Sequence, residues 1–321
     1  MTFRKALLAA LAAAALLPAT ASAGRETAIF YYPWYGSHEH DGAYHHWSQN
    51  GRPAPFEIAS NFFPARGAYS SGDPRVLDAQ MAEIAAAGVR TVVTSWWGWG
   101  SLEDLRLPSV IRAANRRGLA VAAHLEPYEG RTLATVEQDV VHLRTLGIRD
   151  VYVYRPSDIP ADGWAALRAS LGDVRLFAQT NLVGFAAAGR FDGAYTYDIL
   201  LFDSDFFGRF CAQARRAGIL CAPSVGPGYV ATRATGDVRV KKRRHGATYD
   251  AMWRAAVAAR PDVVTITSYN EWNEGTQIEP ASSDPVRAGY LTYDGAYGLR
   301  GLAAEHAYMK RTRFWTRAFR R

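Results

Sequence analysis

Short apolar runs alternate with helical patterns along most of the chain. Eight runs have the length and composition of buried strands: residues 27–32, 89–96, 119–125, 150–155, 174–180, 192–197, 219–224 and 263–269. Between them, apolar residues recur at steps of three and four and a glycine closes each stretch, in residues 73–88, 104–118, 137–147 and 205–218. Eight strands separated mostly by helices predict an α/β fold, a closed (β/α)8 TIM barrel forming a single domain over residues 24–321. A doubly wound open sheet is the main alternative, although no G-x-G-x-x-G follows the first run.

The first 23 residues have the pattern of a secretory signal. Arg4 and Lys5 precede an apolar run over residues 6–17, and small residues ending at Ala23 follow it. The run is too short to span a bilayer, and no other segment is long and apolar enough to do so. We therefore expect a secreted or periplasmic protein without stable membrane insertion.

Cys211 and Cys221 are the only cysteines. Export would allow them to oxidise to a disulfide. They would lie on a helix and on the strand after it, and we favour two buried free thiols.

The formal net charge of +7 is unevenly distributed. Two basic residues lie in the signal, six in residues 309–321 and five in "RVKKRR" (residues 239–244), and the remainder has more acidic than basic residues. Together with export, this distribution argues against a nucleic-acid partner. For the basic C-terminal tail, a solvated helix end is favoured over contact with an anionic cell surface.

Polar and aromatic residues recur where the predicted strands end. They occur in "YYPWYG" (31–36), "SWWGWG" (95–100), "HLEPY" (124–128), "YVYR" (152–155), "YTYD" (195–198), "APSVGPGY" (222–229) and "SYNEWNEGTQIEP" (268–280). In α/β barrels the carboxyl ends of the strands carry the active site. Aromatic rings there suit flat ligands with apolar faces and polar rims, and sugars are of that kind.

Two carboxylates at the last strand exit are the strongest catalytic candidates. Glu271 and Glu274 are three residues apart, so a turn would place them on one side. Two neighbouring carboxyl groups push their pKa values apart, which suits one acid and one base. Such a pair is the minimum apparatus for acid-assisted cleavage of a glycosidic bond.

Other chemistries have weaker signals. His124 and Glu126 could join Glu271 at a metal, but no H-E-x-x-H and no cysteine cluster is present, so we expect no metal and no cofactor. There is no G-x-S-x-G elbow and no convincing P-loop. Four histidines crowd the first loop, where a polar ligand-binding loop is favoured over a metal-binding tract: His38, His40, His45 and His46.

The chain resembles glycoside hydrolase family 99, which contains the endo-α-1,2-mannosidases of glycoprotein processing and bacterial endo-α-1,2-mannanases. The motifs follow the family's order from Phe30 to about Pro280: "FYYPWYG", "HHW", "GAYSSGDPRVL", "SWWG", "HLEPY", "FDGAYTY", "PSVGPGY" and "TSYNEWNEGTQIEP". The resemblance implies a (β/α)8 barrel that cleaves an oligo- or polysaccharide inside an α-mannoside chain, with retention of configuration.

The resemblance also implies roles for the two carboxylates. Glu271 would deprotonate the sugar's own 2-hydroxyl, which attacks the anomeric carbon to give a 1,2-anhydro sugar. Glu274 would protonate the leaving oxygen and then assist water. The strand exits and the motifs together give the candidate substrate-binding residues: Tyr31, Tyr32, Trp34, Tyr35, His46, Trp47, Trp96, Trp97, His124, Glu126, Tyr128, Tyr195, Tyr197, Tyr229, Asn270 and Trp272.

Some segments depart from the animal members of the family. Residues 47–61 and 131–150 are shorter, and both should border the sugar cleft. Asn273 stands where the animal enzymes have His, and Trp97 resembles the bacterial members, whose substrates are α-mannans. Two other hypotheses remain open: a carbohydrate-binding protein that has lost turnover, and a related hydrolase or transferase acting on another α-glycan.

Overall fold

The computed structural model describes residues 25–284, 287 and 289–321. The predicted secretory signal lies outside these residues. Within the described part of the chain, no helix is long and apolar enough to cross a membrane.

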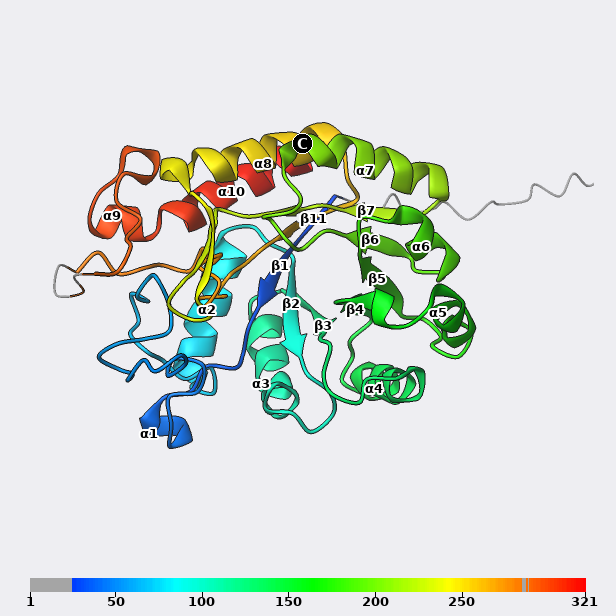
Figure 1. The fold of residues 1–321 in the computed structure, drawn as a ribbon, viewed down its shortest axis with the longest axis horizontal. Coiled ribbons are helices and arrows are strands. Elements are labelled where there is room, and N and C mark those ends of the chain that lie inside the picture. Colours follow the sequence, from blue (N-terminus) through cyan, green and yellow to red (C-terminus); the bar gives the residue numbers. More distant parts are fainter. Residues whose placement is uncertain (1–24, 285–286, 288) are drawn as a thin grey trace, which may run out of the picture.

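A parallel sheet forms the centre of the molecule (Figure 1). Its strands run in the order β7-β6-β5-β4-β3-β2-β1-β11-β8. Their bounds are β1 Glu26–Tyr31, β2 Thr91–Trp96, β3 Ala120–Leu125, β4 Asp150–Val153, β5 Arg175–Gln179, β6 Gly193–Tyr195, β7 Leu220–Ala222, β8 Ser224–Val225 and β11 Val263–Ile266. Only Pro223 separates β7 from β8, so the two ends of this order belong to one interrupted strand and the sheet closes on itself. This confirms the predicted barrel, with β7 and β8 together as its seventh strand.

Helices surround the sheet, most of them in the connections between strands (Figure 1). They are α2 Pro74–Ala86, α3 Leu102–Arg116, α4 Leu133–Thr145, α5 Ala161–Arg168, α6 Val183–Ala188, α7 Ser204–Ala217, α8 Ala247–Ala259 and α10 Ala307–Arg320, with short turns α1 His38–Asp41, η1 Pro156–Asp158, η2 Arg244–Gly246, η4 Ala296–Gly298 and α9 Leu302–Glu305. Local sequence sets the helix ends, as in α2, where the Asp73 carboxylate caps the backbone N–H of Arg75 at 2.8 Å.

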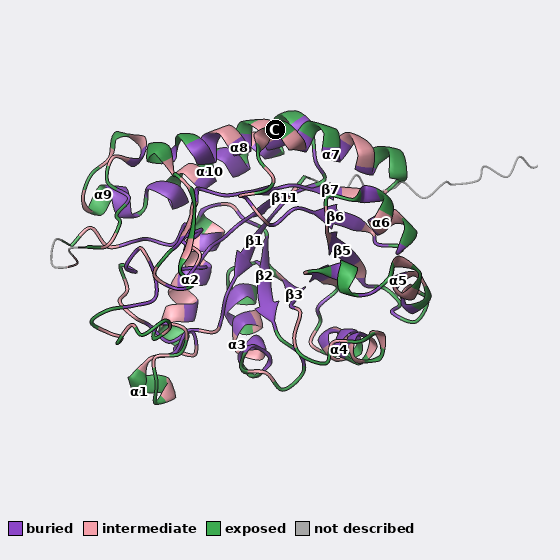
Figure 2. Cartoon of the chain, viewed as in Figure 1, coloured by how far each residue is buried: buried purple, intermediate pink, exposed green. Residues whose placement is uncertain are grey.

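The barrel interior is filled by aromatic rings. The Phe30 ring of β1 lies 4.7 Å from the His124 ring, 5.6 Å from that of Tyr195 and 4.9 Å from that of Tyr197, centroid to centroid. Figure 2 shows the central strands as almost continuously buried, as expected for a parallel sheet covered by helices. These rings pack the interior of the barrel below the ends of its strands.

A short hairpin was not predicted from the sequence pattern. Tyr229–Ala231 (β9) and Asp237–Lys241 (β10) form an antiparallel hairpin after the seventh strand. The basic run "RVKKRR" begins on this hairpin, and the Arg243 guanidinium donates to the carbonyl oxygens of Gly275 (3.0 Å) and Gln277 (2.7 Å). Part of the basic run thus braces the loop that carries the two candidate carboxylates.

The basic C-terminal tail is helix α10, which packs on the barrel. Its apolar face buries Tyr308, Trp315 and Phe319, and its Arg311 pairs with Asp250 of α8 at 2.6 Å. The basic residues therefore lie on the solvent-exposed face of a helix whose other face packs on the barrel.

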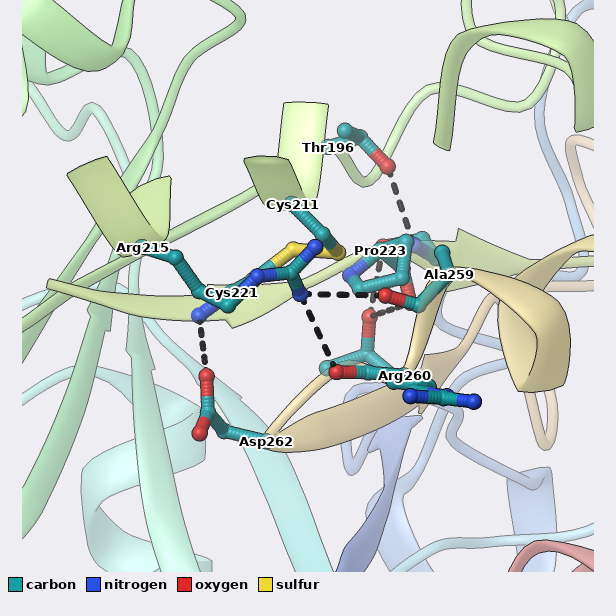
Figure 3. The surroundings of a disulfide bond; sticks show 10 residues. Thr196, Cys211, Arg215, Cys221, Pro223, Ala259, Arg260 and Asp262 are labelled. Atoms are coloured by element: carbon teal, nitrogen blue, oxygen red, sulfur yellow. Dashed lines mark hydrogen bonds between the residues drawn. A yellow bond between two sulfur atoms is a disulfide. The ribbon is translucent and has the colours of Figure 1, made fainter. Parts of the chain in front are cut away.

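The two cysteines form a disulfide, so the expectation of free thiols was wrong. Figure 3 shows the bond between Cys211 of α7 and Cys221 of β7. The tight return from helix to strand brings their Cα atoms to 5.1 Å, within the range that a disulfide spans. Asp262 fixes the strand beside the bond by accepting the backbone N–H of Cys221 at 2.8 Å.

Candidate active site

The segment after β11 forms a tightly bonded loop at the barrel mouth. The Ser268 hydroxyl accepts the backbone N–H of Glu271 at 2.8 Å, and the Glu271 carboxylate accepts the backbone N–H of Asn273 at 3.1 Å. Only 3% of the Glu271 surface is exposed, whereas Glu274 is half-buried. The loop therefore holds one carboxylate inside the wall of the mouth and presents the other toward solvent.

A third carboxylate of this segment is structural. Glu279 is fully buried and accepts hydrogen bonds from Gln80 (2.8 Å), Tyr69 (2.7 Å) and the indole N–H of Trp272 (2.9 Å). Arg66 lies 3.3 Å from it. These bonds hold Trp272 in place, so the loop segment that carries Glu271 and Glu274 is anchored to the interior of the barrel.

The loop after β1 packs against the same segment. The Tyr35 hydroxyl donates to the Asn273 side-chain oxygen (3.2 Å) and accepts the backbone N–H of Trp272 (3.0 Å). Asn270 in turn binds the backbone of Tyr32. The first and last strand exits are therefore locked together around the two carboxylates.

Glu274 lies in the wall of a cavity of about 150 Å³. The other residues around it come from the exits of the fourth, sixth, seventh and eighth strands and from the hairpin: Tyr154, Tyr197, Asp198, Ile199, Leu200, Tyr229, Arg239, Thr267 and Thr276. Asp198 is the last residue of the predicted strand exit "YTYD", but a single carboxylate in a loop gave no indication of its role. Arg239 belongs to the unpredicted hairpin.

The surroundings of the two carboxylates favour retention of a proton. Burial raises the pKa of Glu274 to about 7, and the charges of Asp198, Glu126 and Asp237 act in the same direction while Arg239 lowers it. Burial also raises the pKa of Glu271 well above that of an ordinary glutamate, and the charge of Glu274 adds to this. The pair therefore carries a proton at pH values where isolated glutamates have lost theirs.

The exits of β2 and β3 form another wall of the mouth. The Ser95 hydroxyl donates to Glu126 at 2.8 Å, and the indole N–H of Trp97 donates to the same Ser95 oxygen at 3.1 Å. His124 bridges Glu126 (2.9 Å) and the Tyr195 hydroxyl (2.8 Å). The chain of contacts leads from the buried interior to the exposed ring of Trp97.

Aromatic rings from the first loop form a stack at the mouth. The half-buried rings of Trp34 and His46 stack at 4.4 Å with 7° between their planes, and Tyr32 lies 4.6 Å from Trp34. Burial lowers the pKa of His46 to about 4, with His45 and Arg106 acting in the same direction, so its ring is neutral near pH 7. The Tyr32 hydroxyl contacts that of Tyr197, which joins this stack to the cavity around Glu274.

Some predicted site residues are completely buried behind this surface. The Trp47 indole donates to the Tyr69 carbonyl at 2.8 Å, and the Trp96 indole donates to Asp104 at 2.9 Å. Seven members of the predicted set have no exposed surface: Tyr31, Tyr35, Trp47, Trp96, Tyr195, Asn270 and Trp272. Four more are buried but not completely: Tyr32, His124, Glu126 and Tyr197, at 2%, 1%, 5% and 7% exposed. They position the mouth from behind, whereas Trp34, His46, Trp97, Tyr128 and Tyr229 keep part of their surface exposed.

Among the described residues, no group of three or more His, Cys, Asp or Glu side chains is arranged to hold a metal ion. The crowded histidines of the first loop separate into different contacts. His46 stacks on Trp34, while His40 lies 3.2 Å from Asp73.

The sequence matches the model of glycosyl hydrolase family 99 over residues 24–321. A glycoprotein endo-alpha-1,2-mannosidase-like protein of Danio rerio is 34% identical over 328 residues, covering 83% of this chain and 73% of the relative. A glycoprotein endo-alpha-1,2-mannosidase of Xenopus laevis is 29% identical and covers 91% of this chain and 76% of the relative.

The fold is also similar to a solved structure. The GH99 endo-alpha-mannosidase of Bacteroides thetaiotaomicron, in complex with bis-tris-propane, superposes with a TM-score of 0.83 at 29% identity. The match covers 92% of this chain and 97% of that chain. The similarity therefore extends over nearly the whole chain.

Proposed function

Because the chain belongs to glycosyl hydrolase family 99 and is a glycoside hydrolase, we propose that it is an exported, retaining enzyme that cleaves α-mannoside chains internally, at α-1,2 linkages. The observation that carries the proposal is the pair Glu271 and Glu274. Both sit on one rigid loop at the barrel mouth, and burial raises the pKa of each. A pair that keeps a proton near neutral pH has the acid and the base that glycoside cleavage requires.

In the first step, Glu271 acts as the base. Its carboxylate takes the proton of the mannosyl 2-hydroxyl, and that oxygen attacks the anomeric carbon. The bond to the leaving oxygen breaks, and Glu274 gives that oxygen its proton. The product of this step is a 1,2-anhydro sugar, and the departing chain leaves as an alcohol.

In the second step, the roles of both residues reverse. Glu274, now ionised, takes a proton from water, and the water oxygen attacks the anomeric carbon. The bond between that carbon and the 2-oxygen breaks, and Glu271 returns the proton to this oxygen. Two inversions at one carbon give overall retention, and both residues regain their starting states.

The mechanism requires the shared proton to lie on Glu274 when substrate is bound. Two features of the structure support this distribution. The backbone N–H groups of Asn273 and Glu274 stabilise the ionised form of Glu271, and the negative charge of Asp198 raises the pKa of Glu274.

We also propose that residues 1–23 are a cleaved secretory signal and that residues 24–321 form one catalytic domain. The disulfide between Cys211 and Cys221 supports export, because such bonds persist in oxidising compartments. Mass spectrometry of the exported protein should give a chain that begins at Gly24. A mature chain that retains Met1 would contradict cleavage.

Product analysis tests the proposed activity. The enzyme is incubated with α-mannan, the released oligosaccharides are sized, and the cleaved linkage and initial anomeric configuration are determined. We expect internal cleavage at α-1,2 linkages with α-configured products. Binding of the glycan without release of reducing ends would instead indicate a carbohydrate-binding protein, and cleavage of another α-glycan alone would indicate a different substrate class.

A further inference from the structure

The loop after β2 exposes a second tryptophan beyond Trp97. The exposed fraction of Trp97 is 37%, and that of Trp99 is 67%. Trp97 is tied to the interior through Ser95 and Glu126, as described above. Trp99 stands two residues further along the loop and was not assigned any role from the sequence.

The exposed ring of Trp99 is held in place by packing. One face stacks on the imidazole of His142 in α4, with ring centroids 4.4 Å apart and 12° between the planes. His142 is itself fixed, because its Nε2 lies 2.8 Å from the Asp104 carboxylate. Asp104 of α3 also accepts the backbone N–H of Gly100 at 3.0 Å, so it braces the same loop directly.

The backbone between the two tryptophans is also constrained. Gly98 has a φ of +98°, a conformation that L side chains rarely adopt, and a Cβ there would lie 3.4 Å from the Tyr128 ring. The Tyr128 hydroxyl contacts Asp139 of α4. Two helices and the third strand exit thus fix a loop that would otherwise be free at the surface.

One face of the Trp99 ring is packed against His142 and the other is exposed, so the ring can bind a flat apolar surface. Keeping most of an indole in water forgoes the stabilisation that burial would give. Fixing the ring in advance removes much of the entropy cost of ordering it when a ligand arrives. The apolar face of a pyranose ring is a ligand of suitable shape at the mouth of a glycosidase.

We propose that Trp99 is the platform of a distal sugar subsite, on which a mannosyl residue remote from Glu271 and Glu274 stacks. The inference rests on the proposed function and extends it to chain length. A sugar that far from the scissile bond contributes binding that is equal in the ground and transition states, so it lowers KM without raising kcat. The enzyme should therefore prefer long α-mannoside chains to short ones.

The test compares kcat and KM for a series of linear α-manno-oligosaccharides of increasing length. The variants are Trp99→Ala, Trp99→Phe and, as a matched control, Phe314→Ala, which removes an exposed ring on α10 (52% exposed). For Trp99→Ala we expect KM to rise roughly three- to tenfold on the longest substrates, with kcat retained and the shortest substrates unaffected. Trp99→Phe should lie between this variant and the wild type, and Phe314→Ala should match the wild type.

Equal KM values for Trp99→Ala and the wild type at every substrate length would overturn the proposed subsite. An increase in KM of the same size on the shortest and the longest substrates would overturn it as well. Either result would leave the proposed function standing, because the wild type still cleaves the series. A wild-type enzyme that cleaves no member of the series would overturn the proposed function, and the subsite with it.

Discussion

Asn270 and Tyr32 are joined by two reciprocal hydrogen bonds. The Asn270 side-chain oxygen accepts the backbone N–H of Tyr32 at 2.8 Å, and its amide nitrogen donates to the Tyr32 carbonyl at 2.9 Å. A side-chain amide carries both an acceptor and a donor, so it can satisfy both backbone groups at once. The contact fastens the first strand exit to the loop that carries Glu271.

Asn270→Ala should therefore weaken both the fold and the reaction. The buried N–H and C=O of Tyr32 lose their partners, and each such group costs about 1–3 kcal/mol. We expect a lower free energy of unfolding in urea and a lower kcat, because Tyr32 and Glu271 are no longer held together. The control is Asn181→Ala, which changes an exposed asparagine and should alter neither quantity. An Asn270→Ala variant with wild-type stability and kcat would show that the contact is dispensable.

The charges around Glu274 should set the alkaline limb of the pH profile. Glu274 must be protonated to act as the acid, and its pKa is about 7. The charge of Asp198 raises this pKa, so Asp198→Asn should move the alkaline limb of kcat/KM to lower pH. Arg239 lowers the pKa, so Arg239→Gln should move the same limb to higher pH. Shifts of the two variants in the same direction, or no shift, would reject Glu274 as the titrating acid.

The disulfide should stabilise the fold. Reducing the bond between Cys211 and Cys221 frees a short loop in the unfolded chain, for which chain-entropy arguments give about 3 kcal/mol. We expect dithiothreitol to lower the midpoint of urea unfolding. The double variant Cys211→Ala/Cys221→Ala should unfold at a lower midpoint and be insensitive to the reductant. A wild-type midpoint unchanged by the reductant, with thiols shown to be free, would mean that the bond contributes nothing.

Much of the barrel could be predicted because its signals are local. All eight predicted strands overlap observed ones, since a buried parallel strand is a continuous apolar run whatever its neighbours are. The β9–β10 hairpin has no such apolar run, because β10 is largely exposed and its sequence is typical of a basic surface segment. The basic tail was expected to be a solvated helix end, but the many arginines of α10 masked the apolar face that packs on the barrel.

The sequence indicates where the candidate site lies in the fold, but not how its residues pack. The aromatic and polar residues at the strand exits indicated this end of the barrel. The sequence could not distinguish the buried rings of Trp47 and Trp96 from the exposed ring of Trp97, because burial depends on tertiary packing. The pairing of the cysteines and the contact of Arg243 with the loop that carries Glu271 and Glu274 also depend on which elements meet in space. Asp198 acquires its effect on Glu274 only in the folded barrel.

The division of roles between Glu271 and Glu274 is the central claim, and fluoride release tests it most directly. An α-mannobiosyl fluoride has a leaving group that needs little protonation, so the first step no longer depends on an acid. Single-turnover release of fluoride is measured for the wild type, Glu271→Gln and Glu274→Gln. On a natural glycan each variant should lose about 10²–10⁴-fold or more, as expected for loss of an acid or a base. On the fluoride, Glu274→Gln should recover much of the wild-type first-step rate and Glu271→Gln should not. Recovery by Glu271→Gln instead, or by neither variant, would contradict the assignment of Glu271 as the base and Glu274 as the acid.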